Sequence, residues 1–130
     1  MKEKLGGGCF CGDVRYEVSG VPALQVMCFC SDCLAITGTD GYAGYMVKEE
    51  DFHLKCGAPN VHEKISKEGR KVIRSFCGTC GSNLWGQTEF GLISIAAGTL
   101  DDPEVFQPTT NVFTDHAPHW ARIPHVLKDA

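Results

Sequence analysis

The 130-residue sequence contains no uninterrupted apolar run of the roughly 18 residues that a membrane-spanning helix needs. Its first eight residues, MKEKLGGG, are not followed by the apolar stretch of a secretory signal peptide, so we expect a cytoplasmic protein. Lysine and arginine are never clustered, and 16 acidic against 12 basic residues give a formal net charge of −4. Because nucleic acids and anionic membranes are bound chiefly by clustered positive charge, neither is an expected partner.

Low-complexity segments and internal repeats are also missing from the sequence. The hydrophobic fraction of 43% is ordinary for a globular protein, with 15 glycines and 6 prolines. A chain of this length can bury roughly two thirds of the surface that it exposes when unfolded. We therefore expect residues 1–130 to form a single zinc-binding domain, for the reasons given below.

Short apolar runs broken by glycine, proline or aspartate predict a mainly β fold of short antiparallel strands. Residues 61–68 fit either a helical turn or the first arm of a hairpin that closes at Glu68-Gly69, and we favour the hairpin. A short helix is predicted over residues 32–37, with Ser31 as its N-cap and Gly38 just after its end. The predicted strands are residues 14–18, 24–28, 42–47, 52–56, 71–76, 92–97 and 109–114.

Cysteine is the residue that the sequence has in excess, with eight in 130 residues. In the reducing cytosol these thiols would stay free for metal binding or chemistry instead of pairing as disulfides. The spacing gives Cys-x-Cys at 9/11 and 28/30 and Cys-x-x-Cys at 30/33 and 77/80, and leaves Cys56 alone. This spacing divides seven of the cysteines into two groups.

The segment 77–81, CGTCG, has the spacing of a zinc knuckle, in which glycines permit a tight turn around the ion. We expect Cys9 and Cys11 to lie on one face of a strand, because residues i and i+2 of a strand point the same way. Four thiolates would fill a tetrahedral zinc site and leave no position for substrate. The sequence therefore predicts a structural zinc, with an iron–sulfur cluster or disulfides as alternatives, at Cys9, Cys11, Cys77 and Cys80.

The second group, Cys28, Cys30 and Cys33, supplies three thiolates within six residues. Three protein ligands and one exchangeable position are typical of a catalytic zinc, and the start of the predicted helix would help to keep the thiolates ionised. Zinc on three thiolates is a weak Lewis acid, and its chemistry suits the binding of an incoming thiol as thiolate. We predict that these three cysteines are catalytic as well as metal-binding.

Two alternatives remain open for the second group. Cys56 or a histidine would make it another structural zinc site by supplying a fourth ligand. Against the first of these, Cys56 alternates with Phe52 and Leu54, so we expect it to be a buried apolar thiol. Thiol–disulfide exchange through Cys30 and Cys33 is disfavoured, because such motifs normally open a helix after a strand in a βαβ unit.

Outside the cysteines, the segment DHAPHW at residues 115–120 is the remaining candidate for site residues. His116 and His119 would be able to move protons in a pocket, although histidines on loops are more often solvated bystanders. Trp85 is expected in the core, packed against the structural zinc site.

Three segments, taken in order, resemble the family of glutathione-dependent formaldehyde-activating enzymes and centromere protein V: GGCFCGDVRYEV at 7–18, CFCSDC at 28–33 and FCGTCGSNLW at 76–85. The resemblance covers roughly residues 5–123, and APHW at 117–120 looks like the closing motif of the family with one residue inserted. It implies a β-tent zinc-binding fold with two zinc ions, one structural and one catalytic. It also implies carbon–sulfur lyase activity on a thiol–aldehyde adduct such as S-(hydroxymethyl)glutathione, with the thiol sulfur at the open zinc position.

The sequence departs from the family pattern at the second cysteine group. The family usually has Cys-His-Cys followed by basic residues after the third cysteine, whereas this chain has Phe29, Leu34 and Ala35. Because basic residues would normally hold the two carboxylates of glutathione, a more apolar thiol is the alternative substrate. The expected partner is a small-molecule thiol or thiol adduct. The competing function is a non-catalytic, zinc-stabilised binding module for a small ligand or a protein.

Overall fold

The computed structural model describes residues 3–126 and 128–129, and strands dominate this range. The strands are β1 (Lys4–Gly8), β2 (Arg15–Ser19), β3 (Leu24–Cys28), β4 (Tyr42–Lys48), β5 (Phe52–Cys56), β6 (Asn60–Ile65), β7 (Lys71–Phe76), β8 (Asn83–Gln87), β9 (Leu92–Ala96), β10 (Thr110–Val112) and β11 (Lys128–Asp129). The helices are α1 (Ser31–Thr37) and 3₁₀ turns at Glu49–Asp51, Ala97–Thr99, Pro103–Val105 and Thr114–His116. In the described range, no helix is long and apolar enough to cross a membrane.

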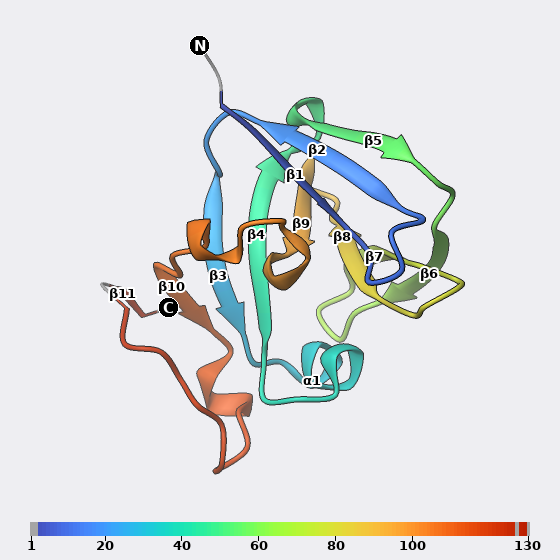
Figure 1. Ribbon diagram of the computed structural model, residues 1–130. Coiled ribbons are helices and arrows are strands. Elements are labelled where there is room, and N and C mark those ends of the chain that lie inside the picture. The colour runs from blue at the N-terminus through green and yellow to red at the C-terminus, as the bar shows by residue number, and fades with distance from the viewer. Residues whose placement is uncertain (1–2, 127, 130) are drawn as a thin grey trace.

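The strands form two sheets. A small sheet has the order β1-β2-β5, and a large sheet has the order β11-β10-β3-β4-β9-β8-β7-β6. Pairing is antiparallel except at β10, which runs parallel to both β3 and β11. The small sheet lies across the upper part of the large one, and α1 lies at the opposite end beside β3 and β4 (Figure 1). The prediction of a mainly β protein with antiparallel strands is confirmed.

The core lies between the two sheets. Tyr16 of β2 is 1% exposed, and its ring packs 5.6 Å from Phe52 and 5.9 Å from Trp85. Alternate residues of the large sheet point the same way, and Ile95 opposite Trp85 is fully buried. Trp85 belongs to the same buried cluster as Cys9 and Cys77. The small sheet therefore covers this face of the large sheet and leaves its other face for a cavity.

Strand β1 was not predicted, because its sequence KLGGG has little strand propensity. The glycines have a packing role that propensity does not reveal. A Cβ atom on Gly7 would collide with the hydroxyl of Tyr16, and one on Gly8 would collide with the Val14 carbonyl. The strand therefore forms because β2 and the core approach its backbone closely, which only glycine allows.

The Cys9–Cys11 segment forms a loop and not a strand, so the prediction of two cysteines on one strand face is wrong. Strand β1 ends at Gly8, and the chain then turns, with Gly12 donating its N–H to the Cys9 carbonyl at 3.2 Å. Gly12 has a φ of +87°, which favours glycine. This turn brings the sulfurs of Cys9 and Cys11 to the same side of the loop, where they face Cys77 and Cys80.

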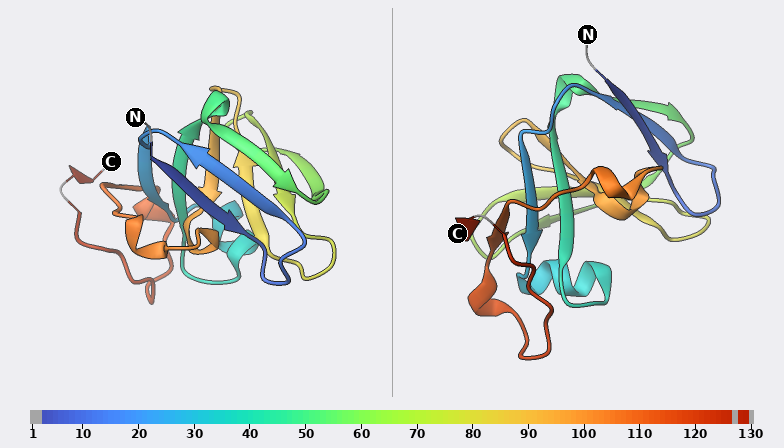
Figure 2. Two further views of the ribbon diagram at one scale, coloured as in Figure 1. Left: turned by 45° about the horizontal axis from the view of Figure 1, so that its top comes forward. Right: turned by 60° about the vertical axis from the view of Figure 1, so that its left-hand side comes forward.

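Strands β6 and β7 form the predicted hairpin. They pair antiparallel from Asn60 opposite Phe76 to Ile65 opposite Lys71. At the turn, Ser66 donates its N–H to the Arg70 carbonyl at 2.8 Å, and Gly69 has a φ of +81°. The hairpin forms one outer edge of the large sheet, as the two views of Figure 2 also show.

Helix α1 starts one residue earlier than expected. Cys30 is its N-cap, and its sulfur accepts a hydrogen bond from the Cys33 N–H at 3.4 Å, so the assignment of Ser31 as the cap is wrong. At the other end, Gly38 has a φ of +68° and donates its N–H to the Leu34 carbonyl at 2.8 Å, as predicted. The helix therefore begins within the second cysteine group.

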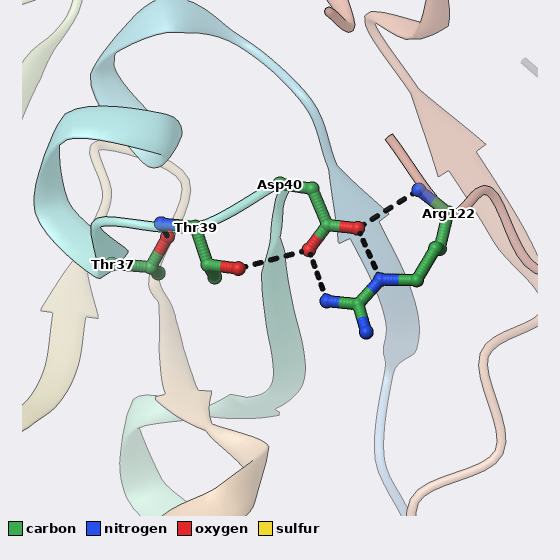
Figure 3. A network of polar contacts seen from close by, with 4 residues as sticks. All are labelled: Thr37, Thr39, Asp40 and Arg122. Carbon is green, nitrogen blue, oxygen red and sulfur yellow. Dashed lines mark hydrogen bonds and ion pairs between the residues drawn. The ribbon is translucent and has the colours of Figure 1, made fainter. Parts of the chain in front are cut away.

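A buried carboxylate fixes the C-terminal segment next to α1 (Figure 3). Asp40, in the loop between α1 and β4, accepts hydrogen bonds from the N–H, Nε and Nη2 of Arg122 at 2.8, 3.0 and 3.2 Å. The hydroxyl of Thr39 donates a further one at 3.1 Å. These contacts anchor the chain that follows β10 on the same end of the large sheet as α1.

Candidate metal centres and active-site cavity

The first cysteine cluster joins two loops that are far apart in the sequence. The Sγ atoms of Cys9, Cys11, Cys77 and Cys80 all lie within 4.8 Å of one another. The Cys9–Cys11 and Cys11–Cys77 sulfur distances are 3.6 and 3.7 Å. A disulfide would need about 2.05 Å, whereas four sulfurs at 2.3 Å from a zinc ion lie about 3.8 Å apart. The donor set and its spacing therefore fit a tetrahedral zinc ion.

Backbone and hydroxyl hydrogen bonds reach three of the sulfurs in this cluster, those of Cys9, Cys77 and Cys80. Val14 donates its N–H to the Cys9 sulfur at 3.2 Å, and Cys80 donates its N–H to the Cys77 sulfur at 3.5 Å. The Ser82 hydroxyl, 3.2 Å from the Cys80 sulfur, lowers the pKa of Cys80 to about 6. Ser82 also accepts the Phe10 N–H at 2.9 Å, which ties the two loops together. Sequence reasoning missed this role of Ser82.

The second cluster combines the end of β3 with the start of α1. The sulfurs of Cys28, Cys30 and Cys33 lie within 4.8 Å of one another. Cys33 is buried and the other two are half-buried. Hydrogen bonds from Cys28 and Cys33 hold the pKa of Cys30 far below its usual value. In the described range, no fourth cysteine, histidine or carboxylate joins this group.

Cys56 belongs to neither cluster. It is exposed near the end of β5, so the expectation of a buried core thiol is wrong. The reason is that β5 is an edge strand of the small sheet, and only Phe52 at its start is partly covered. The alternation of Phe52, Leu54 and Cys56 does not distinguish a covered strand face from an uncovered one.

A cavity of about 280 Å³ opens beside the second cluster, on the face of the large sheet opposite the core. Cys28, Cys30 and Cys33 all line it. Its other walls come from α1, the β6–β7 turn and the segment after β10. The apolar lining includes Val26, Ile36, Met46, Val72, Val112 and Phe113. A small organic ligand in this cavity would therefore lie against the three thiols.

Two polar groups of the cavity are candidates for positioning and proton transfer. The Tyr42 hydroxyl donates to the Ser94 carbonyl at 2.8 Å, and burial raises the pKa of Tyr42. His116 also lines the cavity, and its Nε2 lies 3.7 Å from the Asp115 carboxylate. Both predicted histidines are exposed, but His119 is not among the residues that line this cavity.

The backbone next to His116 is strained. Phe113 has a φ of +57°. Among the residues that the structure describes, it is the one residue other than glycine with a positive φ. Its ring lies 5.5 Å from the His116 ring. Because such strain persists only where the surrounding structure enforces it, the geometry holds both rings at the cavity.

The fold and the site thus define a mainly β protein with two separate cysteine clusters, each able to hold a metal ion. The chain belongs to the family of glutathione-dependent formaldehyde-activating enzymes, because the family model matches residues 4–116. The family relationship that the three cysteine segments predicted is confirmed.

Two further comparisons give one relative in sequence and one protein of similar fold. A protein of Halomonas elongata, named "Putative glutathione-dependent formaldehyde-activating enzyme", is 34% identical over 85 residues, which are 62% of this chain. Those residues cover 54% of the relative, so the chain spans about half the length of the curated relative that it matches. A crystal structure of a Rhodobacter sphaeroides protein superposes with a TM-score of 0.63 at 20% identity, over 79% of this chain and 96% of the other. This last likeness concerns the fold alone.

Proposed function

We propose that this chain is a zinc-dependent carbon–sulfur lyase that acts on a thiol–aldehyde adduct such as S-(hydroxymethyl)glutathione. The observation that carries the proposal is the position of Cys28, Cys30 and Cys33 in the wall of an apolar cavity. Family membership supports glutathione and formaldehyde as the starting compounds. Residues 1–130 would act as one domain with the β-tent zinc-binding fold, in the reducing cytoplasm that free thiols require.

The two clusters have different roles in this proposal. Zinc held by Cys9, Cys11, Cys77 and Cys80 is structural, because four thiolates fill its coordination sphere. Cys28, Cys30 and Cys33 would hold the catalytic zinc, which would favour the ionised form of a substrate thiol. In this proposal, the three cysteines therefore determine where the sulfur of the substrate thiol binds and keep it in its ionised form.

The other cavity residues handle the proton and the solvent. When the thiol adds to formaldehyde, the sulfur loses its proton, a C–S bond forms and the aldehyde oxygen gains a proton. In this proposal, His116 donates that proton in synthesis and accepts it in cleavage, while Asp115 orients the imidazole at 3.7 Å. The apolar walls keep water away from the adduct carbon.

The proposal is tested by the exchange rate between formaldehyde, glutathione and their adduct, measured by NMR with and without the zinc-loaded protein. We expect a rate above the spontaneous one, and Cys30→Ser is expected to remove the gain. The matched control is Cys56→Ser, whose exposed thiol lies outside both clusters and which should retain full activity. Equal rates with and without protein would leave the competing function, a zinc-stabilised binding module.

A further inference from the structure

Strand β7 places one basic side chain on the cavity face of the large sheet. Ser75 pairs with Trp85 and is buried on the core side, so its neighbour Arg74 points to the opposite face. Arg74 lines the cavity and is half-buried there. Its charge also acts on the buried hydroxyl of Tyr42. A guanidinium group is thus present in the same cavity as the three thiols.

Four basic residues line this cavity, and Arg74 differs from Lys67, Arg70 and Lys71 because it is half-buried whereas they are exposed. Lys71 pairs with Glu63 at 3.4 Å, and the Arg70 guanidinium lies 5.1 Å from the centre of the Phe90 ring. Among the residues that the structure describes, no carboxylate lies within ion-pair distance of Arg74. Asp32, Glu68 and Glu89 also line the cavity, but Asp32 pairs with Lys64 and Glu89 accepts the Lys71 N–H. A half-buried cation is stabilised by an anion, and a ligand carboxylate would supply one to Arg74.

The strands β8 and β9 beside Arg74 leave space in the cavity for a ligand carboxylate. Gly86 of β8 is the direct cross-strand neighbour of Arg74, and Ser94 of β9 is the next residue in the same row. A Cβ atom on Gly86 would stand 3.9 Å from Val72 and 4.0 Å from Arg74 without a clash. The glycine therefore leaves open a position beside the aliphatic part of the Arg74 side chain, and Ser94 is the next residue in the row.

The three positions that depart from the family pattern do not line the cavity, so their lack of positive charge does not determine which ligands the cavity binds. Phe29 is fully buried, and neither it nor Leu34 or Ala35 is among the residues that line the cavity. The basic residues of the cavity come instead from β7 and from the turn before it: Lys67, Arg70, Lys71 and Arg74.

We propose that the cavity selects thiols that carry a carboxylate, and that Arg74 is the residue that binds this carboxylate. The inference rests on the proposed function for the position of the sulfur. It adds that recognition occurs at a second point, where a guanidinium can form two parallel hydrogen bonds to one carboxylate. Arg74 is then a specificity-determining residue, and the cavity discriminates against neutral thiols.

The test uses a ligand that does not need the reaction. S-methylglutathione has no free thiol, and its diethyl ester has no negative charge at the carboxyl groups. The ester also adds two ethyl groups, and a preference due to their size alone would persist in Arg74→Gln. We expect calorimetry on the zinc-loaded protein to show about 10- to 100-fold tighter binding of the acid than of the ester. Arg74→Gln should abolish this preference, and Arg74→Lys should restore part of it. Lys55→Gln is the matched control, because that exposed lysine of β5 does not line the cavity and should change binding less than about twofold.

Kinetics separate this inference from the proposed function. With glutathione, Arg74→Gln should raise KM and leave kcat nearly unchanged, because the carboxylate lies away from the reacting atoms. If no protein shows lyase activity but the acid still binds through Arg74, the lyase proposal fails and the inference stands. Equal binding of acid and ester, an unchanged preference in Arg74→Gln, or no binding of either ligand overturns the inference. Thermal melts of both Arg74 variants verify that they are folded.

Discussion

The carboxyl group of Asp40 shows how a single residue can make the stability of the protein depend on pH. Hydrogen bonds from the side chain and the N–H of Arg122 hold the pKa of Asp40 well below its ordinary value. An unfolded aspartate has a pKa of about 3.9. The contact therefore contributes fully above about pH 4 and is lost as the pH falls through the lower pKa of the folded carboxyl.

We predict that Asp40→Asn lowers the melting temperature at pH 7 and that the difference from wild type shrinks below about pH 4. Thermal melts followed by circular dichroism over a pH series measure this. Glu104→Gln is a suitable control, because Glu104 is exposed and its side chain has no ion pair among the described residues. A difference that is independent of pH would contradict the assigned role of the carboxylate.

His116 is the residue at which proton transfer can be tested. We predict that His116→Gln lowers kcat for adduct formation by roughly 100-fold, as expected when a general acid is removed. The zinc content should stay at the wild-type value, because His116 belongs to neither cysteine cluster. His119→Gln serves as the control, since that exposed side chain does not line the cavity. Equal losses in the two variants would exclude a specific role for His116.

Sequence reasoning reached the residues of the site only in part. The grouping of seven cysteines followed from spacing, because short-range spacing limits which sulfurs can converge, and the structure brings both groups together. The sequence did not indicate that Tyr42, Arg74 or Ser94 belongs to the site. These residues lie on three separate strands, and only the pairing of β4, β9, β8 and β7 places them in one cavity.

At the scale of elements, α1 has only seven residues, so its stability depends on the residues that cap its two ends, Cys30 and Gly38. Gly38 adopts a φ of +68°, which costs other residues about 1–2 kcal/mol. We predict that Gly38→Ala destabilises the protein by about that amount, measured by urea unfolding. Gly98→Ala is the matched control: a Cβ at either position meets nothing within 4 Å, but Gly98 does not have a positive φ. An equal change in both variants would show that backbone conformation is not the cause.

The elements that sequence reasoning located correctly have alternating or β-branched residues and clear turns. Strands β3, β5 and β7 have the predicted bounds, and the β6–β7 hairpin closes around Gly69 as expected. Strand β1 could not be predicted, because its stability comes from the close approach of Tyr16 to a glycine backbone. Its end at Gly8 also explains why Cys9 and Cys11 lie in a turn.

At the scale of the whole molecule, the four-cysteine cluster connects the loop after β1 to the loop after β7, and so joins the small sheet to the large one. We predict that Cys77→Ser loses one zinc equivalent and lowers the melting temperature by at least about 10 °C. Cys33→Ser should lose one equivalent as well but retain most of the stability. Elemental analysis combined with thermal melts measures both effects. If Cys77→Ser were as stable as wild type, this cluster would not be structural.

The separation of the cysteines along the chain has a consequence for the order of assembly. Cys28, Cys30 and Cys33 lie within six residues, whereas Cys11 and Cys77 are 66 residues apart. Closing the longer loop costs an unfolded chain about 2 kcal/mol more in entropy than closing the shorter one. In an unfolded chain, Cys28, Cys30 and Cys33 could therefore converge on a metal ion before the two sheets form, whereas the four-cysteine cluster needs its two distant loops to meet first. Metal binding at the two clusters would then follow different steps of folding.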